Sequence, residues 1–260
     1  MAINGIESIA RERGYHVLIY LTHENFEREA GILQQFTSGR VDGILMSVSS
    51  ETSQSNHITE AINEGSPVVF FDRICENINT CSIITNDFEC GYMATKHLIE
   101  KDCKRISYLN IAPKLLICRN RMDGFKQALE ESGMKIQENS VISCSHDSIQ
   151  NEATIKELLR SKKRPDGLIA PVEKLIPPIY KVCETLKLTI PNQVKVVCFT
   201  NLESVEFLNP SLTTITQPAF EIGRTAAINL FRKIEKNREE PKEIIVIPSV
   251  LVERNSTKNK

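Results

Sequence analysis

Long apolar runs, a leader segment and a strong net charge are all lacking in this sequence of 260 residues. No stretch approaches the roughly 18 consecutive apolar residues that a membrane-spanning helix needs. The N-terminus has no basic segment followed by an apolar one, so no secretory signal is visible. The formal net charge of -1 gives the surface as a whole no attraction for nucleic acid or for an anionic membrane. These absences favour a cytoplasmic location and exclude a membrane partner.

Signatures of catalysis and of metal binding are also lacking. We find no glycine-rich dinucleotide or phosphate loop, no G-x-S-x-G nucleophile elbow and no H-E-x-x-H zinc motif. The eight cysteines are scattered, with no C-x-x-C pair and no histidine at metal spacing. We interpret them as reduced side chains that are mostly buried. The sequence therefore predicts no catalytic residue, no metal, no cofactor and no enzymatic activity.

What is present is an ordinary globular composition with a regular pattern. Charged residues make up 25% and hydrophobic residues 41% of the chain, which is long enough for one large or two medium domains. Short apolar runs alternate with amphipathic helical segments. Strands are expected at 16–21, 41–46, 68–71, 82–85, 105–110, 141–142, 167–170 and 194–199, with helices between them. This alternation predicts an α/β fold with doubly wound parallel sheets and right-handed crossovers.

The strand–helix series restarts after Ala112-Pro113, which indicates two lobes of similar size. We expect one lobe to comprise residues 1–111 and 218–239, and the other to comprise residues 112–217 and 240–254. Residues 255–260 are polar, and we expect them to form a disordered tail. The segment Leu212–Pro218 is a short β-prone stretch that ends at a proline, and we expect the chain to cross between lobes there.

Several phrases of the sequence occur in the order typical of one family. They include Arg40-Val41-Asp42-Gly43-Ile44, Pro67 to Arg73, Ala94 to Ile99 and Leu212 to Pro218. Each phrase is weak alone, but the ordered set extends over essentially the whole chain. The sequence therefore resembles the ligand-sensing core of the LacI-type (lactose-repressor-type, LacI/GalR) transcriptional regulators.

The resemblance implies a type I periplasmic-binding-protein-like sensor. Its two lobes would be joined by three crossovers, near residues 112, 216 and 240. A small polar effector (a sugar, sugar acid or sugar phosphate) would bind between the lobes, outside the carboxyl ends of the strands. Such regulators act as homodimers and contact operator DNA through an N-terminal helix-turn-helix domain.

Two elements of that family are not found in the sequence as given. The helix-turn-helix domain is one, and the first strand of the sensor is the other. Without that central strand, its two apolar neighbours in the sheet would be left with unpaired backbone groups. We therefore expect the chain to be a piece of a longer protein or to carry a mis-assigned start.

The expected ligand-contacting positions also depart from the family pattern. The family's acidic residue falls on Asn86, with Asp87 beside it. A later Asn-Asp pair of the family falls on Val172-Glu173, and a further aspartate falls on Thr200. Fewer carboxylates are then available to accept hydrogen bonds from sugar hydroxyls. Arg121 is retained, and because guanidinium groups pair well with carboxylate and phosphate, an acidic or phosphorylated sugar is favoured.

Three arginines are candidates for ligand contact, each with an alternative. Arg121 opens the helix expected at 119–132, and it either contacts the ligand or forms an ion pair with an acidic residue. Arg119 lies two residues earlier and either stays on the surface or reaches the ligand. Arg73 follows the strand at 68–71 and either contacts the ligand or pairs with Asp72 or with Asp87.

The remaining candidates are polar residues next to strand ends. Ser47 and Thr200 either contact the ligand or belong to turns. Asn86 and Asp87 either contact the ligand or cap the helix that follows them. Glu173 is the least supported of the set.

A different class of protein has the same architecture, namely the free solute-binding protein of a sugar transport system. The lack of a signal sequence and the unpaired cysteines disfavour it. The sequence leaves open which effector is bound, and whether it acts as an inducer or as a corepressor.

Overall fold

The structure is a computed structural model that describes residues 1–236 and 243–258. The chain divides into two compact units, which are described one at a time. The first unit comprises residues 1–85, 114–116 and 218–248. The second comprises residues 86–113, 117–217 and 249–260.

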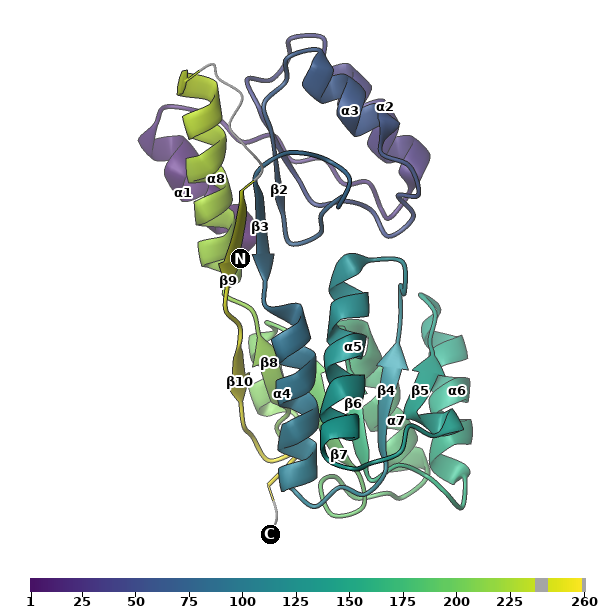
Figure 1. Ribbon diagram of the computed structural model, residues 1–260. Helices are drawn as coiled ribbons and strands as arrows, with labels where there is room; N and C mark the ends of the chain where they lie inside the picture. The colour runs from purple at the N-terminus through teal and green to yellow at the C-terminus, as the bar shows by residue number, and fades with distance from the viewer. Residues whose placement is uncertain (237–242, 259–260) are drawn as a thin grey trace. The chain divides into compact units, whose positions relative to one another are not determined.

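The first unit is built on a parallel sheet of four strands. In spatial order they are β1 (Ile44–Met46), β2 (Val68–Phe71), β3 (Ser82–Thr85) and β9 (Ile244–Ile247). Because β2 is apolar at every position, it can be covered on both faces. Helix α1 (Ala2–Glu12) packs on α8 (Ala219–Lys236), and α2 (Phe26–Phe36) lies beside α3 (Asn56–Asn63) (Figure 1).

The second unit contains a sheet of six strands. In spatial order they are β10 (Val250–Val252), β8 (Thr213–Thr216), β7 (Lys195–Phe199), β6 (Gly167–Ala170), β4 (Ile106–Asn110) and β5 (Val141–Ser143). All neighbours are parallel except β10 and β8. This arrangement confirms the predicted α/β class.

Helices cover both faces of the second sheet. One apolar cluster joins the sheet to α4 (Asp87–Glu100) and α5 (Leu116–Glu131). The other joins it to α6 (Ser148–Arg160) and α7 (Ile176–Thr185). Three short 3-10 helices lie in loops, at Glu138–Ser140, Glu173–Leu175 and Glu203–Phe207. Where α4 crosses α5, Gly91 lies so close that an added Cβ would overlap the backbone carbonyl of Arg121.

One expected strand does not form. Residues 15–22 adopt no regular structure, although the run 16–21 is apolar and rich in β-formers. The side chains from Leu18 to Leu21 are each more than half exposed. The prediction was wrong because a strand is stabilised by pairing, and no described strand is hydrogen-bonded to this run.

The border between the units differs from the expected one near residue 111. Strand β4 is hydrogen-bonded between β5 and β6, so β4 and the preceding α4 belong to the second unit. Strand β9 was expected in the second lobe, but it pairs with β3 in the first unit. The local sequence pattern cannot reveal which sheet a strand joins, because strand–helix repeats look the same in either sheet.

The chain passes between the units after Thr85, Pro113, Leu116, Gln217 and Pro248. The passage after Gln217 lies in the segment Leu212–Pro218, where a crossover was expected. The crossover expected near residue 240 lies outside the described residues.

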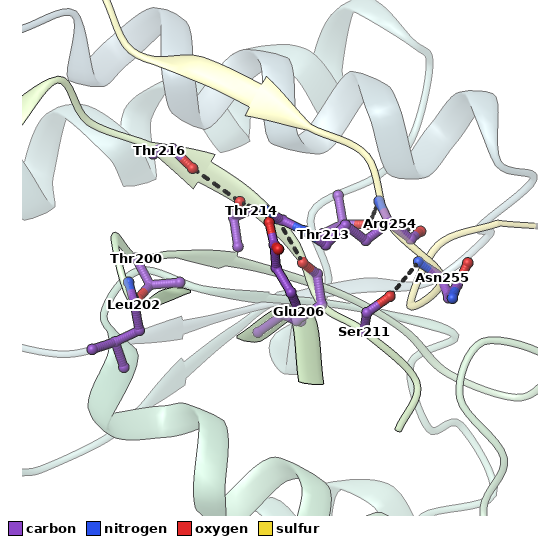
Figure 2. Close-up of polar contacts among 10 residues, drawn as sticks. Thr200, Leu202, Glu206, Ser211, Thr213, Thr214, Thr216, Arg254 and Asn255 are labelled. Atoms are coloured by element: carbon purple, nitrogen blue, oxygen red, sulfur yellow. Dashed lines mark hydrogen bonds and ion pairs between the residues drawn. The ribbon is translucent and has the colours of Figure 1, made fainter. Parts of the chain in front are cut away.

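The expected disordered tail is ordered as far as the structure describes it. Ser256 and Thr257 are fully buried. The Thr257 hydroxyl lies 2.7 Å from the Thr213 hydroxyl and 2.8 Å from Nε2 of His97. The Ser256 hydroxyl donates to the carbonyl of Val196 at 2.7 Å. Figure 2 shows the neighbouring residues Arg254 and Asn255 beside Thr213 and Ser211. Polar composition gave the wrong prediction, because these side chains are hydrogen-bonded inside the unit.

Candidate functional site

The carboxyl ends of the parallel strands are where open α/β sheets bind ligands. In the second unit, β4 ends at Asn110, β6 at Ala170 and β7 at Phe199. Figure 1 shows the arrowhead of β4 at this edge of the unit. Pro171 and Thr200 follow two of these strands directly, and the helix after β4 supplies Arg121.

Arg121 is the most buried charged candidate, with 4% of its surface exposed. Its Nε donates to Oδ1 of Asp87 at 2.8 Å, and its Nη1 donates to the carbonyl oxygen of Pro171 at 2.7 Å. The guanidinium carbon lies 4.3 Å from the ring centroid of Phe199. Burial lowers the pKa of Arg121, but the Asp87 carboxylate more than offsets this and raises it overall. Arg121 is therefore charged and held at three points.

The remaining nitrogen of this guanidinium is buried without a partner. Arg121 Nη2 makes no hydrogen bond within the described part of the chain. Buried donors are nearly always paired, because an unpaired one costs about 1–3 kcal/mol. The side chain thus keeps one donor available inside an otherwise fixed arrangement.

Two more buried polar atoms lie on β4. The hydroxyl of Tyr108 and Oδ1 of Asn110 lack a hydrogen-bond partner among the described residues. These residues are two positions apart and share one side of the strand. The Tyr108 ring packs against Phe125, 5.5 Å between centroids, and Phe125 lies one helical turn after Arg121. Burial raises the pKa of Tyr108, so its phenol stays neutral and can donate or accept.

Arg119 is half-buried, and it points to a different side of the helix from Arg121. Residues two apart on a helix point to different sides. The helix also begins at Leu116 rather than at 119, so Arg121 is its sixth residue and does not open it. Arg121 therefore lies beyond the first turn of the helix, where the helix dipole would disfavour a cation.

Asn86 and Asp87 take separate roles. Asn86 occupies the N-cap position of α4 but makes no side-chain cap. Its Oδ1 accepts from the backbone N–H of Ser249 at 2.8 Å and from Sγ of Cys90 at 3.3 Å. Asp87 is 5% exposed and pairs with Arg121. The expectation that Asn86 caps the helix with its side chain was wrong, because that oxygen is used by Ser249.

Thr200 and Glu173 are joined to each other. The Thr200 hydroxyl donates to Oε2 of Glu173 at 3.1 Å and accepts from the backbone N–H of Leu202 at 3.1 Å. Thr200 is buried and Glu173 is exposed. Both residues therefore have partners within the protein, and Thr200 organises the turn that follows β7 (Figure 2).

In the first unit, Arg73 pairs with a residue that the sequence analysis missed. Its Nη1 donates to both carboxylate oxygens of Glu24, at 2.7 and 2.9 Å. Oε2 of Glu24 also accepts from the N–H of Ser50 at 2.7 Å. Partial burial raises the pKa of Glu24, but Ser50 and Arg73 lower it overall to about 2. No motif marks Glu24, which is 49 positions from Arg73.

The loops around this pair are conformationally unusual. His23, Glu24 and Asp72 have positive φ angles of 53°, 61° and 63°. Non-glycine residues in this region concentrate at functional sites. Ser47 is half-buried and precedes Val48, whose N–H donates to the carbonyl of Arg73 at 3.2 Å. Arg73 and Ser47 thus lie near each other.

A second buried carboxylate, Glu29, organises the loop after β1. It is 2% exposed and accepts from the N–H of Ser49 at 2.7 Å and from the hydroxyl of Thr52 at 2.7 Å. Nε2 of His57 lies 3.0 Å from the same carboxylate. The helical spacing of α2 places Glu29 next to the apolar Ala30 and Leu33, but nothing in the sequence predicts three partners.

Metal and membrane sites are not found in the described residues. They contain no group of three or more His, Cys, Asp or Glu residues able to hold a metal ion. None of the described helices is long and apolar enough to cross a membrane.

Comparison with known proteins identifies the fold family. The profile of the periplasmic binding protein-like domain matches residues 95–257. The chain belongs to this family. The match extends over more than half of the sequence and includes Arg121, Thr200 and the buried C-terminal segment.

Related proteins narrow the assignment to LacI-type regulators. The chain is 27% identical over 256 residues to the HTH-type transcriptional repressor PurR of Vibrio atlanticus, covering 98% of this chain and 76% of the repressor. The crystal structure of the transcription regulator CcpA of Lactococcus lactis is similar in fold, with a TM-score of 0.87, 23% identity and coverage of 99% and 93%.

The crystal structure of a third relative contains a bound sugar. This relative is the periplasmic binding protein/LacI transcriptional regulator of Alkaliphilus metalliredigens complexed with D-xylulofuranose. Its TM-score is 0.82 at 25% identity, with 99% of this chain and 93% of the other covered. The family member described here is thus the ligand-binding core of a LacI-type regulator.

Proposed function

We propose that this sensing core binds a small polar metabolite, namely a sugar, a sugar acid or a sugar phosphate, at the carboxyl ends of the strands in the second unit. The observation that carries the proposal is the unpartnered Nη2 of buried Arg121. A guanidinium fixed through its other nitrogens pays little further ordering entropy when it donates to a ligand oxygen. Tyr108 and Asn110, on β4, supply two further buried polar atoms without a partner among the described residues.

The chemical class of the ligand follows from the polar groups that remain after the internal pairs are accounted for. Asp87 is paired with Arg121, and Glu173 accepts from Thr200. The Nη2 donor of Arg121 is left over, and it favours a ligand oxygen, either of a hydroxyl or of an acidic group. The D-xylulofuranose in the relative from Alkaliphilus metalliredigens supports a sugar.

The regulatory part of the proposal rests on the relatives. PurR of Vibrio atlanticus is a helix-turn-helix repressor. We propose that effector binding shifts a conformational equilibrium of a homodimer and so changes operator affinity, with the DNA contacted by a helix-turn-helix domain outside this sequence. We place the protein in the cytoplasm and assign it no enzymatic activity. Contact of the effector with Arg73, Ser47 or Arg119 stays a prediction.

The experiment is a thermal-shift screen with D-xylulose, ribose, gluconate and glucose 6-phosphate. We expect at least one to raise the melting temperature of the wild-type protein. In Arg121→Lys the ion pair with Asp87 can persist, but Nη2 is gone, so the ligand-induced shift should disappear while the fold remains. Arg160→Lys makes the same change at an exposed residue and serves as the control. A ligand shift that survives in Arg121→Lys would assign Arg121 a purely structural role.

A further inference from the structure

The second unit has an open pocket at the edge opposite Arg121. It lies at the amino ends of the parallel strands, where β4 and β6 begin. Its walls come from residues within three segments, 104–107, 134–140 and 163–165, and from Leu129. The pocket is small and partly open to solvent. Since Arg121 lies beyond the other ends of these strands, the two sites are separate.

The lining of this pocket is cationic. It contains Lys104, Arg105, Lys135 and Lys163, and it contains no acidic residue. Glu138 lies between two lining residues but is not part of the lining. The whole chain has a net charge of -1, so the local excess does not reflect the composition. Cations that converge on one pocket repel each other, and an anion would relieve that repulsion.

The carboxylate of Asp166, which follows the lining residue Pro165, forms its hydrogen bonds with backbone groups and not with the lining side chains. Asp166 Oδ1 accepts from the backbone N–H groups of Lys104 and Arg105, at 3.0 and 2.8 Å. Its Oδ2 accepts from the N–H of Lys104 at 3.1 Å. Within residues 1–236 and 243–258, none of the four lining cations forms an ion pair with an acidic side chain.

The pocket walls are fixed independently of any ligand. Arg105 Nε donates to the carbonyl of Arg164 at 2.8 Å, which orients the guanidinium and leaves its terminal nitrogens available. The hydroxyl of Ser107 donates to the carbonyl of Asn139 at 2.6 Å. Gln137 and Ser140 form a reciprocal capping box. Such preorganisation lowers the entropic cost of binding.

We propose that this pocket binds a phosphate group, either as inorganic phosphate or as the monoester of a small metabolite. Phosphate offers several oxygens, which match one guanidinium fork and three ammonium groups. Binding here is independent of the effector site, because the residues involved come from the other ends of the strands.

The test is calorimetric titration of the protein with inorganic phosphate and with glucose 6-phosphate at constant ionic strength. We expect Lys135→Gln/Lys163→Gln to weaken phosphate binding by about tenfold or more, because two charge-assisted contacts are lost. Lys126→Gln/Lys181→Gln removes the same charge outside the pocket and should change the affinity by less than about twofold. Because glucose 6-phosphate is also a candidate effector, its titration is repeated with Arg121→Lys. Binding tighter than that of inorganic phosphate that persists in this variant would assign the monoester, and equal binding would assign the free anion.

Three outcomes would overturn the proposal. The first is a titration in which phosphate does not bind. The second is equally tight binding of sulfate, and the third is an equal loss of affinity in the control pair and the pocket pair; both would indicate non-selective attraction of anions to surface charge. Arg121→Lys should leave the binding of inorganic phosphate unchanged. Loss of phosphate binding in that variant alone would place the anion at the effector site, which would reject this pocket and leave the proposed function standing.

Discussion

At the scale of single residues, Arg121 shows how a buried charge can have a structural role and a binding role together. Its ion pair with Asp87 and its bond to Pro171 offset the cost of burial, and its third nitrogen remains available. The sequence offered ligand contact and an ion pair as alternatives. The structure contains the ion pair and leaves Nη2 without a partner among the described residues.

Glu24 gives a pH-dependent prediction. Its pKa is lowered from 4.5 to about 2 in the folded protein, so its stabilising effect is present above pH 4.5 and is lost as the pH falls toward 2. At neutral pH, Glu24→Gln should lower the free energy of unfolding by about 1 kcal/mol, a value reduced because the pair is partly exposed. Urea denaturation at several pH values measures the difference.

Wild type and Glu24→Gln should become equally stable near pH 2. Glu51→Gln is the matched control, because Glu51 is exposed and forms no ion pair within the described residues. A difference between wild type and Glu24→Gln that stays constant from pH 7 to pH 2 would show that the Glu24–Arg73 pair does not stabilise the protein.

At the scale of elements, the crossing of α4 and α5 depends on glycine. An added Cβ on Gly91 would overlap the carbonyl of Arg121, which is backbone and cannot rotate away. Gly91→Ala should therefore destabilise the protein by about 1–3 kcal/mol or more. Gly31→Ala, on α2, meets nothing within 4 Å and should stabilise it by about 0.5–1 kcal/mol, through helix propensity.

The opposite signs of these two substitutions separate packing from propensity, and thermal unfolding of both variants measures them. If Gly91→Ala were as stable as the wild type, the close approach of the two helices would be wrong. The same crossing positions Arg121 against Asp87, so Gly91→Ala should also reduce the thermal shift produced by an effector.

Elements with strong local signals could be predicted from the sequence. Strands β2 and β3 form at the expected residues, because their apolar runs and flanking turns specify both the strand and its ends. The failures involve long-range pairing. The run at 16–21 has the composition of a strand but no pairing partner, and β4 joins the second sheet through hydrogen bonds to β5 and β6.

The site was predictable in part for the same reason. Family resemblance marked Arg121 and Asp87, which the structure brings together, and Thr200 and Glu173, which also touch. Resemblance could not mark Glu24, because its pairing with Arg73 depends on two loops that the fold brings together. Nor could it mark Tyr108, whose sequence context is that of an ordinary buried strand.

At the scale of the whole molecule, the exposed apolar run from Leu18 to Leu21 has a consequence for colloidal behaviour. Contiguous exposed apolar side chains with free backbone groups promote association between molecules.

Light scattering of the chain should therefore increase with concentration. Leu18→Lys/Leu21→Lys should delay that increase, while Ile136→Lys/Ile149→Lys, which changes the net charge equally at exposed positions elsewhere, should have little effect. Equal effects of the two pairs would attribute the association to net charge. If only the substitutions at Leu18 and Leu21 delay the increase, this short run limits the concentration at which the protein remains unassociated.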